Sequence, residues 1–421
     1  MLNRFFHQAA IPKEYHSNFT HLYLDIAWFG VLSGSTVNFL NVYATRIGAT
    51  GFQIGLIGAM AAIVNLFLAI PAGRWLEKRH IGPAMFWTSV YYRIGFLGFI
   101  LLPWLFNEAG QIVAVIVLTF VMAIPLTPLG VGFNALFAEA VPTEYRAHVA
   151  GVRNVMLAIT FMVTALLSGY ILDRVTFPIG YQIVFAIGFV GAAMSSYHLY
   201  FIKPLGREKT SVPAQPTPAS TSQTNSPRNT SSLLRLDIWN TPYRNILLGL
   251  FGYHFAQYLA LPIFPLFNVR ELNLNDNQIG IGTALFYLTV FLGSTQLRRV
   301  VHRIGNKRAT GWGVLGMALY PIFIAFSQNA WHFYAVSTIG GFIWSLAGGS
   351  YANYMLEHIP SHDRPPHLAW YNIMLNIAVL VGSLGGPAIA DQLGLFDALI
   401  LFGILRFLSG VAILKLSLIH I

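Results

Sequence analysis

The chain alternates long apolar runs with short polar segments. A helix needs about 20 apolar residues to cross a bilayer, and twelve runs reach that length. They cover residues 20–45, 52–73, 84–105, 111–138, 151–172, 181–203, 243–267, 277–297, 309–327, 331–355, 367–390 and 396–418. The pattern therefore predicts an all-α integral membrane protein with twelve transmembrane helices.

Composition excludes the main soluble classes. Of the 421 residues, 55% are hydrophobic and only 10% are charged, whereas a soluble domain carries about 25% charged residues. Such a chain cannot build the polar exterior of a soluble enzyme, a nucleic-acid binder or a secreted module. The absence of cysteine excludes disulfides and thiolate metal sites. We expect no cofactor, no metal and no nucleic-acid partner.

The excess of basic residues predicts the topology. The formal net charge is +10, and Lys and Arg concentrate in cytoplasmic loops of membrane proteins. A cytoplasmic N-terminus places 20 of the 25 basic residues on the inside, Arg153 among them. Residues 1–19 have no separate apolar core, so we expect no cleaved signal peptide. The sequence predicts a multi-pass, monomeric protein of the plasma or inner membrane with both termini cytoplasmic.

A polar segment divides the chain into halves. Of the 23 residues from Thr210 to Ser232, 19 are Ser, Thr, Asn, Gln or Pro, which bury too little apolar surface to fold. We expect a flexible cytoplasmic linker at 206–235 between six-helix bundles at 1–205 and 236–421.

The two halves repeat each other. The run Gln53-Ile54-Gly55 recurs as Gln278-Ile279-Gly280, an offset of 225 residues. The same offset relates Arg74 and Lys78 to Arg299 and Arg303, and an offset of 218 relates Glu139, Pro142 and Arg146 to Glu357, Pro360 and Arg364. Parallel six-helix repeats are a known transporter architecture, with the substrate site near the midplane between the halves.

With these motifs the whole chain resembles the major facilitator superfamily. The motif residues are Gly73, Glu77, Lys78 and Arg79 after the second span, His302 and Arg303 after the eighth, and Glu139, Arg146, Glu357 and Arg364 in the two later loops. The resemblance implies a latch that closes the cytoplasmic side, with Glu77 facing the start of the eleventh helix. The alternative is that these charges only obey the topology rule. Leu126 stands where drug-efflux members of the family usually carry Arg, which disfavours drug export.

The resemblance implies a secondary or facilitative transporter of a small solute that works by alternating access. Proton coupling is left open. The alternative is a receptor or sensor on the same fold that does not transport. A membrane-embedded enzyme is disfavoured because it needs clustered His, Asp or Glu, and the spans offer only Asp25 and His254.

Ionisable side chains inside the spans are candidate site residues because they are costly in a bilayer. Asp25 is the only acid in a span, and it is a candidate for proton or cation coupling or for a structural bond near the interface. Arg93 and Arg406 either line the substrate route or form structural ion pairs or snorkel. His254 with Gln257 is a candidate ligand or proton carrier, or simply hydrogen-bonded.

Amides and prolines complete the candidates. The amides that need partners within the membrane are Asn38, Asn41, Asn134, Asn353, Asn372 and Asn376, and for about half of them we favour bonding between helices. Pro262 and Pro265 break the seventh span, which a bilayer tolerates only against protein or a wet cavity. These two prolines are candidate gate residues.

Overall fold

The computed structural model describes residues 12–205, 235–360 and 363–416. The linker predicted at 206–235 lies outside these ranges except for its last residue. The first half comprises α2 (Lys13–Leu32), η1 (Ser33–Val37), α3 (Asn38–Arg46), α4 (Gly51–Glu77), α5 (Ile81–Leu105), α6 (Glu108–Ala140), α7 (Arg146–Arg174) and α8 (Ile179–Tyr200).

The second half has the same kind of architecture. It comprises η2 (Leu236–Asn240), α9 (Tyr243–Ala260), α10 (Ile263–Leu266), η3 (Phe267–Glu271), α11 (Asp276–Ala325), α12 (Ala330–Glu357), α13 (Arg364–Leu393) and α14 (Leu395–Leu416). The predicted all-α fold is confirmed over the described residues.

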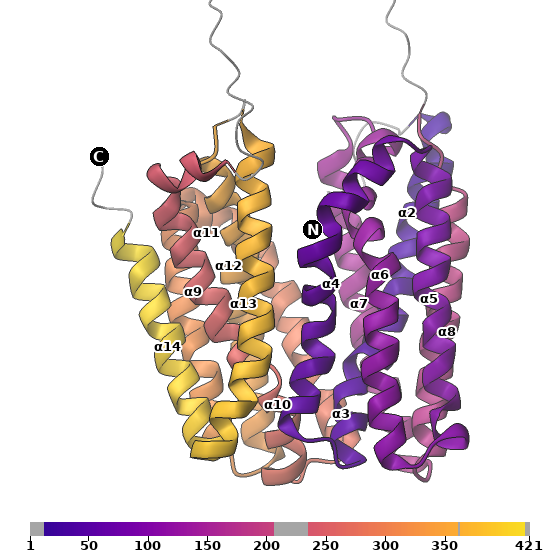
Figure 1. Ribbon diagram of the computed structural model, residues 1–421, viewed down its shortest axis with the longest axis vertical. Coiled ribbons are helices and arrows are strands. Elements are labelled where there is room, and N and C mark those ends of the chain that lie inside the picture. Colours follow the sequence, from indigo (N-terminus) through magenta and orange to yellow (C-terminus); the bar gives the residue numbers. More distant parts are fainter. Residues whose placement is uncertain (1–11, 206–234, 361–362, 417–421) are drawn as a thin grey trace, which may run out of the picture.

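The helices form two bundles that stand side by side (Figure 1). In the first bundle α2 packs on α7 and α8, and α5 packs on α6 and α8. In the second, α11 packs on α12 and α14, and α9 packs on α13 and α14. The bundles meet where α4 lies on α13 and α7 lies on α11. The division of the chain at 1–205 and 236–421 stays a prediction.

Nine helices in the described ranges are by themselves long and apolar enough to cross a membrane. One of them, α11, has 50 residues, about 75 Å if straight, which is far more than one crossing needs. Its backbone is non-helical at Gly305 (φ 79°, ψ 160°), so it consists of two limbs. If both limbs of α11 are counted as spans, and the α2–α3 run and α12 are added, the described residues contain twelve candidate spans. The number of transmembrane helices stays a prediction.

Several helices extend past the predicted spans at their polar ends. α2 begins at Lys13 rather than at residue 20, and the first limb of α11 continues past 297 to the break at Gly305. The cause is general: a helix continues beyond its apolar window wherever exposed polar residues keep helical geometry. As a result, Asp25 lies twelve residues inside its helix rather than about five.

The strongest sequence repeat marks the start of two equivalent helices. Gln53 and Gln278 each close a capping box, with Thr50 at the start of α4 and Asn275 at the start of α11. The neighbouring glycines let helices from opposite halves approach closely. A Cβ on Gly55 would lie 2.1 Å from the Ser383 carbonyl oxygen, and one on Gly280 would lie 2.8 Å from that of Ala165.

Candidate functional site

A cavity of about 380 Å³ lies between the two halves, within the range of small-molecule sites. The first half contributes residues of α3, and the second half contributes residues of α9 to α12 and α14. Its apolar wall is aromatic, with Phe286, Tyr287 and Trp344 among the lining residues. None of the described residues that line the cavity is acidic.

Amide side chains lining the cavity have buried polar atoms without a hydrogen-bond partner. They are Asn38 Nδ2 and Asn41 Oδ1 on α3, Gln257 Oε1 on α9 and Asn268 Oδ1 on η3. Buried polar atoms are normally paired, so each unpaired one needs an explanation. A bound polar solute or water would satisfy all four.

Arg406 reaches the same cavity from α14 and is 2% exposed. Its Nη1 donates to the carbonyl oxygen of Met317 at 3.1 Å, and its Nη2 donates to that of Gln257 at 3.5 Å. Its Nε has no partner. Among the described residues no carboxylate forms an ion pair with this guanidinium, so its charge is not neutralised.

Asp25 and Arg93 belong to a different site, inside the first bundle. Asp25 is 3% exposed and accepts a hydrogen bond from Ser195 at 2.6 Å. Arg153 lies 3.3 Å from one carboxylate oxygen and Arg93 lies 3.7 Å from the other. The structure thus places Asp25 in a buried cluster with two arginines.

Arg153 corrects the sequence assignment. The positive-inside count placed it with the loop residues, but it lies two turns inside α7 and is 7% exposed. The error arose because the fifth span was predicted to begin at residue 151, so a cation at its edge was counted with the loop. Arg93 and Arg153 together form the structural ion pairs that the sequence analysis offered as one alternative for Arg93.

Direct bonds join the halves at the end of the molecule formed by the 46–51 and 271–276 loops. Arg46 on α3 pairs with Asp276 at the start of α11 at 3.0 Å and donates to the carbonyl oxygen of Leu274 at 2.6 Å. Arg270 donates to the carbonyl oxygen of Ala49 at 2.6 Å. We call the pair Arg46–Asp276 the outer clasp.

The latch residues predicted at the opposite end do not hold the two halves together in this conformation. Glu77, Lys78, Arg79, Arg303 and Arg364 are all exposed. His302, Glu139 and Glu357 are also exposed, whereas Gly73 and Arg146 are half-buried. Arg146 donates to the carbonyl oxygen of Val141 at 3.0 Å, and Glu357 accepts from Asn306 at 2.6 Å, so both bond within their own half. The latch role stays a prediction for a conformation other than this one.

The remaining candidates divide into bonded and exposed groups. His254 is buried, with its Nε2 3.0 Å from the Tyr371 hydroxyl. Asn376 is 3.4 Å from Asn65 of the other half, the bonding between helices that was favoured. Asn134, Asn353 and Asn372 are exposed. Pro262 follows the end of α9, and Pro265 lies in the short α10, so the predicted break in the seventh span is confirmed while its role as a gate stays a prediction.

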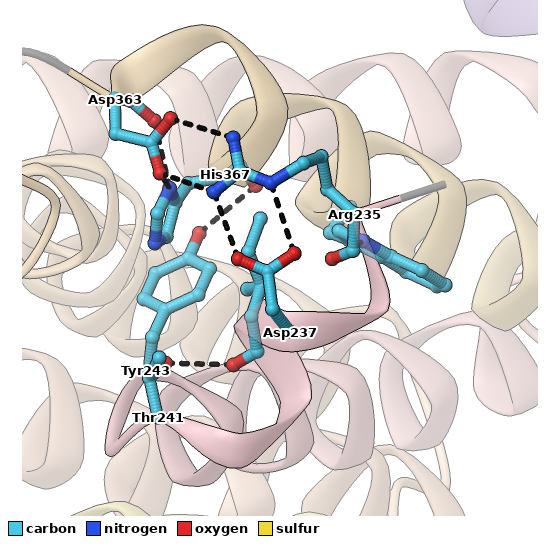
Figure 2. Close-up of polar contacts among 8 residues, drawn as sticks. Arg235, Asp237, Thr241, Tyr243, Asp363 and His367 are labelled. Carbon is cyan, nitrogen blue, oxygen red and sulfur yellow. Dashed lines mark hydrogen bonds and ion pairs between the residues drawn. The ribbon is translucent and has the colours of Figure 1, made fainter. Parts of the chain in front are cut away.

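A second ionic cluster in the second bundle is centred on Arg235 (Figure 2). Arg235 bridges Asp237 at 2.8 Å and Asp363 at 3.0 Å. Through this bridge the segment before α9 is tied to the segment before α13. The hydrogen bond from Arg235 holds the pKa of the Asp237 carboxyl below its usual value.

Besides the residues of the outer clasp, sequence reasoning missed Asn268 and Asn65, which lie at the cavity and between the halves. Asn268 lies one residue beyond the predicted seventh span, so it was not counted as intramembrane. Asn65 accepts a hydrogen bond from Thr127 at 2.7 Å and contacts Asn376 across the halves. Its signal was present, because it is the single asparagine within the apolar run 52–73.

Comparisons with known proteins agree with this arrangement. A family model described as Major Facilitator Superfamily matches residues 26–245 and 246–419. The chain is 24% identical over 302 residues to the "Cis,cis-muconate transport protein" of Acinetobacter baylyi (strain ATCC 33305 / BD413 / ADP1), which covers 70% of each protein. The similar proteins are membrane transporters rather than enzymes.

Solved structures with low sequence identity share the fold. A bacterial homologue of the iron transporter ferroportin, solved in an inward-facing state, has a TM-score of 0.70 at 13% identity and covers 95% of this chain and 98% of that one. A nucleoside transporter has a TM-score of 0.68 at 12% identity, covering 94% and 99%. The xylose transporter of E. coli has a TM-score of 0.65 at 14% identity, covering 95% and 97%.

Proposed function

Because the chain belongs to the major facilitator superfamily, we propose that it carries a small organic solute across a membrane by alternating access. The two bundles rock against each other about the cavity between them. The observation that carries this proposal is the cavity lined by both halves, combined with the outer clasp that joins the halves at one end. A relative named for muconate transport supports a small organic cargo.

The conformation fits one stage of that cycle. The clasp lies at the end opposite to the one where α8 ends and α9 begins (Figure 1), so under the predicted topology the clasp joins the halves on the outside. The exposed latch residues at the other end agree with a cavity that faces the cytoplasm. Rocking would break the Arg46–Asp276 pair and engage Glu77.

Reconstitution tests transport directly. Purified full-length protein in liposomes is expected to exchange a labelled solute for the same solute on the other side, after a thermal-shift screen of organic metabolites has identified one that binds. A solute that stabilises the protein but is never exchanged would favour the alternative of a receptor or sensor.

We propose proton coupling through Asp25, with His254 as the second group. A coupled proton must load and unload inside the membrane, and these are the ionisable groups of the spans that suit the task. Uptake into liposomes with and without an imposed pH difference compares the parent with Asp25→Asn and His254→Ala. Asp25→Asn removes the partner of two buried arginines, so its folded, monodisperse fraction is the one reconstituted. That fraction is expected to lose accumulation against a gradient while exchange survives. Accumulation that is unchanged in both variants would exclude both groups.

We propose a monomer of the plasma or inner membrane, with both termini in the cytoplasm. The positive-inside count supports this orientation even after Arg153 is removed from it. Reporter fusions at residues 206–234 and at the C-terminus are expected to read cytoplasmic. A C-terminal reporter that reads external would contradict the topology.

A further inference from the structure

The buried arginines of the two bundles differ in their hydrogen-bond acceptors. In the first bundle, Arg93 shares the carboxylate of Asp25 with Arg153. In the second bundle, Arg406 is equally buried and donates only to two backbone carbonyl oxygens. Carbonyl dipoles solvate a cation without neutralising it, and an unneutralised charge away from water is costly.

The surroundings of Arg406 identify what is missing. Arg406 lines the cavity between the halves, where no described lining residue is acidic and its Nε has no acceptor. A guanidinium is matched in shape and charge by a carboxylate, which it binds through two parallel hydrogen bonds. The missing counterion therefore has to come from a molecule that enters the cavity.

We propose that the cargo is an organic anion that carries a carboxylate and that Arg406 is its anchor. The aromatic wall formed by Phe286, Tyr287 and Trp344 suits a flat or unsaturated carbon skeleton. This inference deepens the proposed transport function. It rests on that function only where it states that the bound anion is transported. The binding of an anion at Arg406 can be tested without any measurement of transport.

The amides give such a cargo a second point of attachment. Asn38 and Asn41 lie on α3 of the first half and line the same cavity as Arg406, which belongs to the second half. A molecule held by Arg406 at one end and by these amides at the other contacts both halves. Occupancy then favours closure of the halves around the cargo, because only the closed arrangement satisfies both ends.

The first experiment measures binding by titration calorimetry on the purified full chain, so it does not depend on transport. The probes are cis,cis-muconate and its dimethyl ester, which has the same skeleton without charge. The diacid is expected to bind and the ester to bind at least about tenfold more weakly, because a charge-assisted pair is lost. Equal binding of the two would overturn the proposal.

Variants locate the anion on Arg406. Arg406→Gln is expected to weaken muconate binding at least about tenfold, with Arg406→Lys in between, because Lys keeps the charge but lacks the fork of donors. The control is Arg174→Gln, which removes an exposed arginine at the end of α7 and is expected to leave binding unchanged. Wild-type affinity in a folded Arg406→Gln protein would overturn the assignment.

A second measurement works even if Arg406→Gln fails to fold or muconate is the wrong anion. The chain has no cysteine, so Thr283→Cys introduces a single thiol on the cavity wall. Normalised to mercaptoethanol, an anionic methanethiosulfonate reagent is expected to react at least about tenfold faster than a cationic one, because the cavity concentrates anions. No preference, or the reverse, would contradict an anion site. A clear preference without muconate binding would support the site and point to a different carboxylate.

If the anion binds and is not exchanged across liposomes, the anchor stands and the transport proposal fails. If a neutral solute is exchanged and no anion binds, transport stands and the anchor fails. The two outcomes separate the two proposals.

Discussion

At the scale of single residues, Asp25 holds a buried cluster together. Among the described residues of the first bundle, Asp25 is the only acid that pairs with two cations, and these are Arg93 and Arg153. Ser195 donates to it as well. Removing one partner from such a cluster leaves the others charged and buried, and that costs more than the pair itself contributes.

We therefore predict that Asp25→Asn destabilises the protein by about 3 to 5 kcal/mol. Replacing an arginine as well, in Asp25→Asn with Arg153→Gln, is expected to recover part of the loss because one uncompensated cation is removed. Denaturation of four proteins in the same detergent, namely the parent, Asp25→Asn, Arg153→Gln and the double variant, measures the coupling as a double-mutant cycle. Additive effects of the two changes would show that the residues do not interact.

The residue scale also shows where sequence reasoning reached its limit. An ionisable residue within a span is visible from the sequence, so Asp25, Arg93, Arg406 and His254 were found. Whether such a group is paired depends on which helices face each other, and that information is not local. The sequence therefore could not tell that Arg93 has a counterion while Arg406 has none within the described part of the chain.

At the scale of helices, closure of the outer end depends on backbone contact at glycines. Gly280 on α11 lies against Ala165 and Gly169 of α7, where an added Cβ would be 2.8 Å from a carbonyl oxygen. Backbone atoms cannot move aside as a flexible side chain does, so even one methyl group separates the two helices.

We predict that Gly280→Ala weakens the closed outer end by about 1 to 3 kcal/mol through overpacking. Ser383→Cys, buried on α13 at the other contact between the halves, is expected to become accessible to maleimide in this variant. Gly130→Ala on α6 is the control, because nothing lies within 4 Å of the added Cβ. Equal labelling in the two variants would exclude a role for the Gly280 contact.

The ionic bridge before α9 and α13 predicts a dependence on pH. The hydrogen bond from Arg235 lowers the pKa of Asp237 in the folded protein. A lowered folded pKa contributes stability above the unfolded pKa, about 3.9 for Asp, and the contribution is lost as pH falls through the folded value.

The melting temperature of Asp237→Asn is therefore expected to lie below that of the parent between pH 5 and pH 8, by a constant small amount because both side chains are largely exposed. The difference should shrink below about pH 4 and also at high salt. A difference that grows on acidification would contradict the assigned pairing.

Helix ends show why the sequence predicted elements better than boundaries. The apolar runs found the spans because burial in lipid selects for them, and the repeat found two capping boxes, at Gln53 and Gln278, without identifying them as such. The sequence did not predict that the eighth and ninth spans continue into each other within α11. The largely basic segment 298–308 is typical of a loop, although all of its residues except Gly305 are helical.

At the scale of the whole molecule, we expect the outer clasp and the predicted latch, at opposite ends, to compete. The outer clasp Arg46–Asp276 is formed in this conformation, and Glu77 at the other end is exposed. If the halves rock as rigid bodies, contacts at one end form as those at the other end break. Each set then stabilises one state, and mutations at the two ends act on the same equilibrium in opposite directions.

The last prediction tests that opposition. Asp276→Asn removes a partly exposed pair worth about 1 kcal/mol or less, so it is expected to raise the outward-open population up to about fivefold and to speed maleimide labelling of Ser383→Cys. Glu77→Gln removes a stabilising charge at a helix start, worth about 0.3 to 1 kcal/mol, and is expected to lower that population.

The double variant should return toward the parent because free energies at distant sites add. A cysteine at the exposed position Asn353 reports the cytoplasmic side and should change in the opposite sense to Ser383→Cys. If the second change leaves labelling at both positions as it is in Asp276→Asn alone, Glu77 is not a latch, and its charge serves only the topology of the loop.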